Sequence, residues 1–357
     1  MPAYKVAGTL AVLFSLVHIA AADEVYSENC QIVDDIESIC GLRRPEDIVV
    51  APNGRDLIFS QMEDGGTLAL LDTHNHSVHT LFPGSDSSVA SDELWGESSC
   101  QTPSEFLKPH GIDLSQRGDG RWQLLVVNHS GRESVEFFEL VFGDQGRARA
   151  IWRGCAVAPE QGNFNDVAAL PDGGFLVTHM ADIDSQTWAL FLIQLGIDSG
   201  FVYRWDKDTG YAPVPGTQGK MPNGIILDQD KMSFFVNMYF GDEIRKFDLA
   251  SGALLGQVSV EKPDNLSWNP RGKLLVASQQ SSLLALLQSL DQNDPGPSLL
   301  PFSIFEIDPV TLEKRLVLAR DGGPMGAGTV AVELDGYLYI GSYIGDRMIK
   351  IALPAGD

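Results

Sequence analysis

One short pattern recurs along the chain and limits the folds that it can adopt. A carboxylate or amide side chain stands six residues before a turn, and a short apolar strand follows the turn. The four clearest copies begin at Glu46, Asn165, Asn223 and Asp264. Their turns contain Asn-Gly, Asp-Gly, Asp-Lys or Arg-Gly, and such residues favour tight reversals between strands. The pattern predicts repeated β-hairpins with a polar side chain at a fixed place in each.

Two looser copies bring the number of units to six. Pro109-His110-Gly111 leads to a strand at 123–127, and Gly328-Thr329-Val330 leads to a strand at 337–340. The spacing of roughly 40 to 65 residues is expected of propeller blades with several short strands each. We therefore expect an all-β fold, a six-bladed β-propeller. A double-sheet sandwich is the alternative, although it gives no reason for polar groups at a fixed offset.

The polar residues of these units suit a hard cation. They are carboxylates and amides with almost no cationic residue among them. Calcium takes about six to eight oxygen ligands in loose geometry, and a radial repeat can aim one oxygen per unit at a common axis. Adjacent strand residues such as Glu46 and Asp47, or Asn165 and Asp166, point to different sides and can serve different ions. Taken singly, any of them could instead cap a turn.

Composition and charge narrow the function classes. The chain has 357 residues, of which 44% are hydrophobic, so it can bury a large core. Its net charge of -23 argues against binding to nucleic acid or to anionic lipid, because both would repel it. The same charge is compatible with cation binding. Most of the acidic residues are nevertheless expected on the solvated surface.

The N-terminal residues have the layout of an export signal. Lys5 precedes an apolar run over 6–19, and Ala20-Ala21-Ala22 stands before Asp23. We therefore expect a signal peptide at 1–22 and a single secreted or periplasmic domain at 23–357. A retained membrane anchor is the alternative, but the run is shorter than the ~20 residues that a spanning helix needs. No later stretch qualifies as transmembrane.

Cysteines and acceptor patterns fit an exported protein. Four cysteines are compatible with two disulfides, and of the three possible connectivities we expect Cys30 with Cys40 and Cys100 with Cys155. The pattern for N-linked glycosylation, which would make the chain a glycoprotein, occurs three times. The acceptor positions are Asn75, Asn128 and Asn265.

Longer segments carry a family resemblance. They are residues 45–48, 107–112, 124–129, 134–138, 163–167, 222–225, 263–267, 328–331 and 338–341. From about Asn29 to the C-terminus the chain resembles the paraoxonase, or arylesterase, family. The resemblance implies a six-bladed propeller with two calcium ions in a central tunnel and short helices at its rim. By position it implies a catalytic calcium held by Glu46, Asn165, Asn223, Asp264 and Asn265. It also implies a deeper, structural calcium held by Asp47, Asp166 and the backbone carbonyl of Ile112.

The resemblance also implies an activity. The family is similar to lactonases and aryl esterases, and calcium explains how an ester is cleaved without a serine nucleophile, because the ion polarises the carbonyl. The chain has no Gly-x-Ser-x-Gly elbow. His110 and His129 match the family's histidine pair, in which one imidazole would deprotonate water and the other would orient it. Two ordinary packing histidines are the alternative.

The rim of the tunnel would set specificity. Trp188 and Phe191 lie in an apolar segment that resembles the family's active-site wall helix, so we expect them in the substrate pocket. A core helix is the alternative. His179 follows a strand and is expected to contact substrate at the tunnel mouth. A second apolar insertion at 281–302 could cover the pocket, contact a lipid surface or merely pack.

Two positions depart from the family pattern. No cysteine follows Cys155, so the ring must close by strand pairing unless Cys30 has another partner. Ser278-Gln279 replaces a Cys-His pair, which puts the organophosphate side activity in doubt.

Two function classes follow. The first is a calcium-dependent hydrolase of lactones or aryl esters, with a small-molecule substrate. The second is a noncatalytic, calcium-stabilised propeller that binds a peptide, a sugar or another small ligand. The six-bladed gluconolactonases and strictosidine synthases keep a third possibility open, and a gluconolactonase-like enzyme would prefer sugar lactones.

Overall fold

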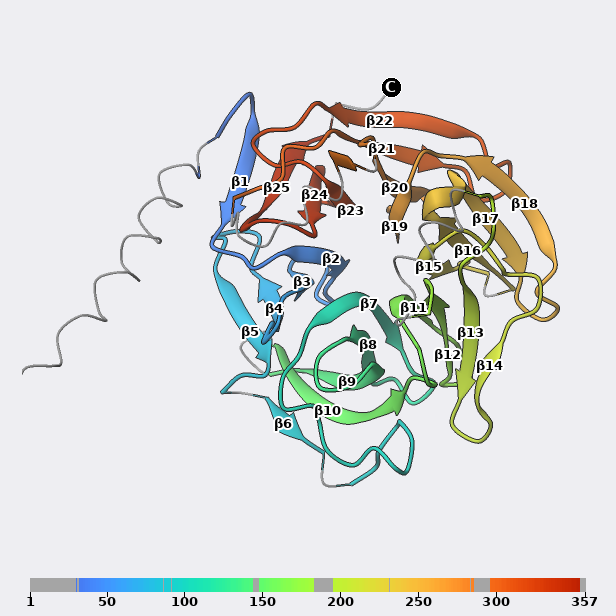
Figure 1. Ribbon diagram of the computed structural model, residues 1–357. Coiled ribbons are helices and arrows are strands. Elements are labelled where there is room, and N and C mark those ends of the chain that lie inside the picture. Colours follow the sequence, from blue (N-terminus) through green and yellow to red (C-terminus); the bar gives the residue numbers. More distant parts are fainter. Residues whose placement is uncertain are drawn as a thin grey trace, which may run out of the picture.

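Six sheets surround one axis. The computed structural model describes residues 30, 32–85, 87–90, 92–143, 148–182, 195–230, 232–282, 284–285 and 296–353. Within them five four-stranded sheets and one five-stranded sheet form a ring (Figure 1). The expected six-bladed β-propeller is therefore confirmed. Helix in the described residues is limited to the 3-10 turn η2 (Tyr239–Gly241) and positions 284–285, so the expected rim helices are not seen there.

Five blades run outward in chain order. Blade 1 has β2 (Pro45–Val50), β3 (Leu57–Gln61), β4 (Leu68–Leu71) and β5 (Val78–Phe82). Blade 2 has β7 (Pro109–Gln116), β8 (Trp122–Asn128), β9 (Ser134–Phe142) and β10 (Ala148–Val157), with β6 (Ser88–Val89) at its edge. Blade 3 has β11 (Phe164–Ala169), β12 (Phe175–His179), β13 (Phe201–Asp206) and β14 (Gly210–Pro213). Blade 4 has β15 (Pro222–Leu227), β16 (Ser233–Met238), β17 (Glu243–Asp248) and β18 (Leu254–Ser259). Blade 5 has β19 (Pro263–Trp268), β20 (Leu274–Gln279), β21 (Phe302–Ile307) and β22 (Lys314–Arg320).

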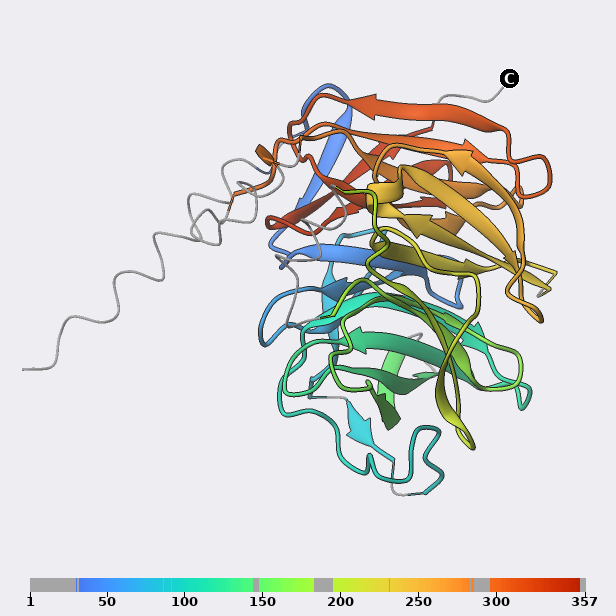
Figure 2. The same ribbon diagram turned by 45° about the vertical axis from the view of Figure 1, so that its right-hand side comes forward.

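The sixth blade joins the two ends of the chain. It contains β23 (Gly328–Leu334), β24 (Tyr337–Ser342), β25 (Arg347–Ala352) and, outermost, β1 (Ile36–Cys40). β1 pairs antiparallel with β25, and both views show it beside the last strands of the chain (Figure 2). Strand pairing therefore closes the ring, as the lack of a late cysteine suggested. The predicted Cys30–Cys40 and Cys100–Cys155 disulfides are both present.

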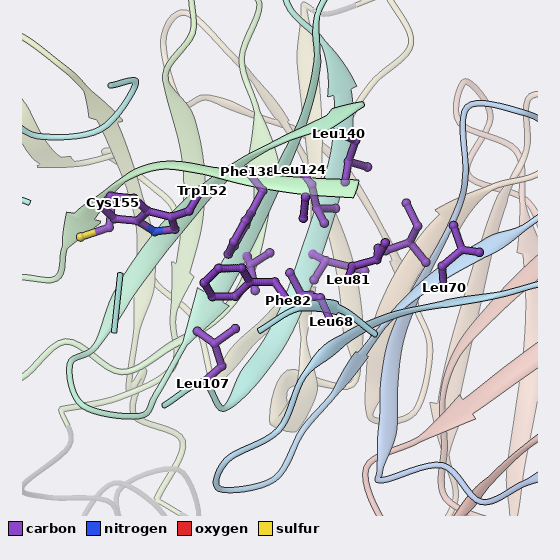
Figure 3. Close-up of a cluster of buried hydrophobic side chains, with 14 of the residues drawn as sticks. Leu68, Leu70, Leu81, Phe82, Leu107, Leu124, Phe138, Leu140, Trp152 and Cys155 are labelled. Carbon is purple, nitrogen blue, oxygen red and sulfur yellow. The ribbon is translucent and has the colours of Figure 1, made fainter. Parts of the chain in front are cut away.

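Apolar side chains between neighbouring blades hold the ring together. One buried cluster joins blades 1 and 2, and it packs Leu68 and Phe82 against Leu124, Phe138 and Trp152 (Figure 3). Complete burial of a large apolar side chain contributes about 1.5–3 kcal/mol. Comparable clusters lie between the other blades. The inner strands are therefore fixed around the axis by packing on both faces.

Every inner strand carries an irregularity near its first residues. The strand pairing register shifts at the start of β2, β7, β11, β15, β19 and β23. A bulge leaves residues unpaired and re-aims their side chains. The polar residues of the sequence repeat fall within these shifts, for example Glu46 between Pro45 and Ile48, and Asn165 between Phe164 and Val167. The repeat in the sequence is thus a repeated bulge at one end of the axis.

Burial corrects two of the glycosylation predictions. Asn128 and Asn265 are fully or almost fully buried, with 0% and 1% of their surface exposed, so neither can carry a glycan in the folded chain. Asn75 is exposed in the turn between β4 and β5 and remains a candidate. None of the helices in the described parts of the chain is long and apolar enough to cross a membrane.

Candidate functional site

The five predicted ligands of the catalytic cation meet at the bulged end of the axis. The Asn265 Nδ2 group donates to Glu46 Oε1 at 2.8 Å, although the two residues are 219 positions apart. His110 Nε2 lies 3.7 Å from Glu46 Oε1 and 3.4 Å from Asn165 Nδ2. The Asn223 side chain hydrogen-bonds to Asp264. These contacts join strands of blades 1 to 5 in one buried cluster.

Within the described residues, four oxygens of this cluster have no hydrogen-bond partner. They are Glu46 Oε2, Asn165 Oδ1, Asn223 Oδ1 and Asn265 Oδ1, and all are buried. Buried polar atoms are nearly always paired, and each unpaired one costs about 1–3 kcal/mol. Unpaired carboxylate and amide oxygens that lie together are the ligand type that calcium prefers. The residues present therefore fit a hard divalent cation.

The candidate cation site contains few acidic side chains, so a search for clustered acidic residues does not find it. Among the described residues, no group of three or more His, Cys, Asp and Glu side chains is placed to hold a metal. Only two of the five predicted ligands, Glu46 and Asp264, are carboxylates. The other three ligands are asparagine amides, so the candidate site depends on neutral oxygens.

The carboxyl groups near the axis are buried and lie close to one another. Burial raises the pKa of Glu46 well above its usual value, and the charges of Asp47 and Asp264 raise it further. Burial also raises the pKa of both Asp47 and Asp264 to about 7. None of the ion pairs in the described residues joins these groups to Lys or Arg. A divalent cation would relieve both the desolvation and the mutual repulsion of the ionised forms.

The predicted ligands of the structural cation are placed differently. The carboxylates of Asp47 and Asp166 each accept one backbone N–H from the next residue and one from a neighbouring blade. Ile112 donates to Asp47 at 2.7 Å, and Ile225 donates to Asp166 at 2.8 Å. Ile112 therefore contacts Asp47 through its backbone N–H, whereas its backbone carbonyl was the predicted calcium ligand. These aspartates link adjacent blades and have no unpaired oxygen, so the second calcium stays a prediction.

The two predicted histidines form a chain with a third residue that the sequence did not indicate. His110 Nδ1 lies 2.8 Å from His129 Nε2, and His129 Nδ1 lies 2.8 Å from Glu133 Oε2. The other oxygen of Glu133 accepts the Phe164 N–H at 2.6 Å, which fixes the carboxylate between blades 2 and 3. An ionised carboxylate only accepts, so His129 Nδ1 carries a hydrogen. His129 Nε2 then accepts from His110 Nδ1, and His110 Nε2 keeps a lone pair.

That lone pair faces the cation ligands. His110 is largely buried, and burial lowers the pKa of its imidazole well below 6.5; the charges of His129 and Lys108 lower it further. His110 is therefore neutral at physiological pH and can accept a proton at Nε2. A proton acceptor beside a candidate cation site is the arrangement needed to deprotonate a water molecule.

A second chain of hydrogen bonds orients the carboxylate of Asp264. Gln279 Nε2 donates to Asp264 Oδ2, and Tyr239 Oη donates to Gln279 Oε1 at 2.9 Å. Burial raises the pKa of Tyr239 well above 10, so its hydroxyl stays a donor. Asn237 Nδ2 also donates to the backbone carbonyl of Asp264. In the sequence Gln279 stood out only as a departure from the family pattern, and nothing pointed to Tyr239 or Asn237.

Of the predicted substrate contacts, His179 alone lies within the described residues. His179 is 3% exposed, its Nδ1 accepts the Asn163 N–H at 3.2 Å, and its ring packs against Phe201 and Tyr203. It thus packs inside blade 3, and its contact with substrate stays a prediction. Trp188 and Phe191 lie outside the described residues, as does much of the insertion at 281–302.

Comparison with known proteins gives one family. A family model described as "SMP-30/Gluconolactonase/LRE-like region" matches residues 59–284, which is more than half of the chain. No curated protein matches the chain. The matched region includes Asn165, Asn223 and Asp264 and ends before blade 6. This result supports the gluconolactonase-like alternative and leaves the paraoxonase resemblance a prediction.

Solved structures share the architecture at low identity. A luciferin-regenerating enzyme is 14% identical, with a TM-score of 0.55, and the match covers 90% of this chain and 95% of that chain. A gluconolactonase from Xanthomonas campestris is 16% identical, with a TM-score of 0.51 and coverage of 95% and 94%. Regucalcin from Agrobacterium tumefaciens, a calcium-binding protein, is 10% identical, with a TM-score of 0.50 and coverage of 88% and 92%. At these identities the likeness establishes the fold.

Proposed function

The chain belongs to the SMP-30/gluconolactonase/LRE-like family, and from this premise we propose that it is a lactonase-like hydrolase that requires a divalent cation, calcium in our prediction. One observation carries the proposal. Four buried oxygens that find no partner among the described residues lie together, and the unprotonated nitrogen of a histidine relay lies beside them. The gluconolactonase and the calcium-binding regucalcin among the similar structures agree with this chemistry.

Glu46, Asn165, Asn223, Asp264 and Asn265 would hold the cation. When bound, calcium would polarise the substrate carbonyl and stabilise the oxyanion that forms on hydrolysis. The remaining chemistry belongs to His110, whose Nε2 accepts a proton from the attacking water. The Nδ1 hydrogen bond to His129, and from there to Glu133, stabilises the imidazolium. The same proton then returns to the leaving alkoxide, so the lactone becomes a hydroxy acid.

Three classes of substrate are compatible with the proposed hydrolase. Family membership and the gluconolactonase structure support a sugar lactone at least as well as an aliphatic lactone or an aryl ester. A panel of gluconolactone, an aliphatic lactone and an aryl acetate separates these classes by relative kcat/KM. We also propose export from the cytoplasm, because two disulfides are typical of oxidising compartments.

Substitution of His110 tests the mechanism. His110→Gln should lower kcat for the best lactone by about 100-fold or more, the usual contribution of a general base. His79→Gln, on the exposed part of the outer strand β5 of blade 1, is the matched control and should keep the wild-type rate. Full activity of a folded His110→Gln protein, or of wild-type protein in EDTA, would show that the proposed mechanism is wrong.

A noncatalytic binding module is the second candidate, and one observation favours it. The five predicted ligands are only 1% to 5% exposed, which also suits an ion that serves folding alone. This function predicts no turnover across the substrate panel together with a calcium-dependent melting temperature. Turnover of any member of the panel that is lost in EDTA would decide for the hydrolase.

A further inference from the structure

A cavity opens at the end of the axis opposite the cation ligands. Its volume is about 670 Å³, and the ends of β7, β11, β15 and β19 line it. The lining on β15 begins at Ile226, three residues after Asn223, and the lining on β19 is Trp268, four residues after Asp264. At about 3.3 Å per strand residue this places the cavity some 10–15 Å from the cation ligands. No residue of the candidate catalytic site contributes to it.

Apolar side chains form part of the cavity wall. Leu114, Trp122, Ile226, Leu227 and Trp268 line it from three blades. The Trp268 indole is fixed by its hydrogen bond to the Leu227 carbonyl at 3.1 Å and by an edge contact with Phe235. A cavity of this size, with aromatic side chains in its wall, can hold a small molecule.

The acidic residues of the cavity already have partners. Asp113 accepts the Ala169 N–H at 2.7 Å. Asp172 pairs with Arg204 at 2.5 Å, and Asp228 pairs with Lys246 at 2.7 Å. None of these carboxylates therefore needs a cation or a hydrogen-bond donor from a ligand.

Arg117 is the lining residue whose donors are not all used. Its guanidinium lies 4.3 Å from the centre of the Trp95 ring, and its Nη1 donates to Gln123. Its Nε is buried without an acceptor, and in the described parts of the chain Nη2 has none either. By contrast, Arg121 also lies over Trp95 but pairs with Glu93 and Asp119. Arg117 is thus held in place, and none of the ion pairs in the described residues includes it, although the charges of Asp119 and Glu93 act on it.

We propose that this cavity binds a small amphipathic carboxylate, with its apolar part against Trp122 and Trp268 and its carboxylate on Arg117. The guanidinium provides a planar set of donors that matches a carboxylate. This ligand site is separate from the proposed hydrolase centre. Binding of the carboxylate would be a function in addition to hydrolysis.

Calorimetric titration with 4-phenylbutanoate, its neutral amide and acetate tests the proposal. The full-length protein should bind 4-phenylbutanoate, and both the amide and acetate should bind at least about tenfold more weakly, because each lacks one half of the recognition. Equal affinities for the acid and the amide would overturn the proposal, as would no binding of the acid.

Variants locate the binding site. Arg117→Gln should weaken binding of 4-phenylbutanoate about tenfold, whereas Arg121→Gln, the matched control, should leave it unchanged. Ser115→Asp adds a negative charge to the lining and should also weaken binding, which provides a test if Arg117→Gln fails to fold. His110→Gln should bind the probe as the wild type does, because its site is at the other end of the axis. Loss of binding in His110→Gln, or wild-type affinity in Ser115→Asp, would show that 4-phenylbutanoate binds outside the cavity and would refute the proposal.

Discussion

Glu133 controls where the protons of the histidine relay lie. Its carboxylate can only accept, so it sets the tautomer of His129 and, through His129, which nitrogen of His110 is unprotonated. The Phe164 N–H holds the other carboxylate oxygen and therefore the orientation of the whole relay. A single residue outside the cation cluster thus determines whether His110 can accept a proton.

Replacement of Glu133 by Gln should therefore damage catalysis without unfolding the chain. Gln keeps an acceptor for Phe164 but can present its NH2 group to His129, which reverses the tautomer. We expect kcat to fall by about tenfold or more with little change in KM. The acid limb of the kcat/KM profile should also move to lower pH, because the lost negative charge favoured the protonated histidine pair.

The exposed Glu160→Gln is the control for this variant. Both proteins should keep the wild-type circular dichroism spectrum. A Glu133→Gln pH profile that superimposes on that of the wild type would reject the positioning role.

The sequence predicted part of this site at the scale of residues. Glu46, Asn165, Asn223 and Asp264 could be found because each occupies the same place in a repeated unit, and the structure brings them together. Glu133, Gln279 and Tyr239 have no counterpart in the repeat. Their roles arise from contacts between segments that are distant in the chain, such as the 40 residues between Tyr239 and Gln279. Side-chain direction there depends on tertiary packing, which local patterns do not encode.

At the scale of elements, the bulged starts of the inner strands create the site. They approach one another so closely that glycine is required at two of the bulges. A Cβ atom on Gly111 would lie 2.4 Å from Asp166 Oδ1, and one on Gly224 would lie 2.4 Å from the Asp264 carbonyl oxygen. The sequence predicted the strands and their turns, but the shared register shift became evident only in the folded ring.

Gly224→Ala should push β15 away from β19 and weaken the cation site. We expect a lower melting temperature, at least about tenfold weaker calcium binding and a matching loss of hydrolysis, because a backbone atom cannot move aside as a side-chain tip can. Gly118→Ala is the matched control, since an added Cβ there meets nothing within 4 Å. Equal calcium affinities of the two variants would contradict the role given to the close approach.

At the scale of the whole molecule, the ring places ionisable groups where water cannot reach them. The cysteines allowed three connectivities, of which the expected one is present, and the lack of a late cysteine favoured closure by strand pairing. The pairing of β1 with β25 became evident only in the structure. The substrate pocket was not settled, because Trp188 and Phe191 lie outside the described residues. The burial of Asp47 and Asp264 has a consequence for the stability of the entire fold.

Without a divalent cation, stability should fall as the pH rises. In the folded chain the pKa values of Asp47 and Asp264 are raised from 3.8 to about 7, so the folded state binds more protons than the unfolded state between these values. The resulting loss of folding stability is absent below pH 4, grows between pH 4 and pH 7, and is complete above pH 7. Melting temperatures in EDTA should therefore be several degrees lower at pH 8 than at pH 5. Added calcium should restore most of that loss at pH 8 and little at pH 5, because protonated carboxyls bind it poorly. Equal melting temperatures at both pH values in EDTA would contradict this prediction.

The most direct test of the central claim is a calorimetric titration of chelator-treated protein with calcium. If the unpaired oxygens of Glu46, Asn165, Asn223 and Asn265 belong to one cation site, the wild-type chain binds calcium saturably. Asn223→Leu, which removes one oxygen at nearly constant volume, then binds it at least about tenfold more weakly. The exposed Asn75→Leu should match the wild type. No calcium binding by the wild type, or unchanged affinity in a folded Asn223→Leu protein, would contradict the claim.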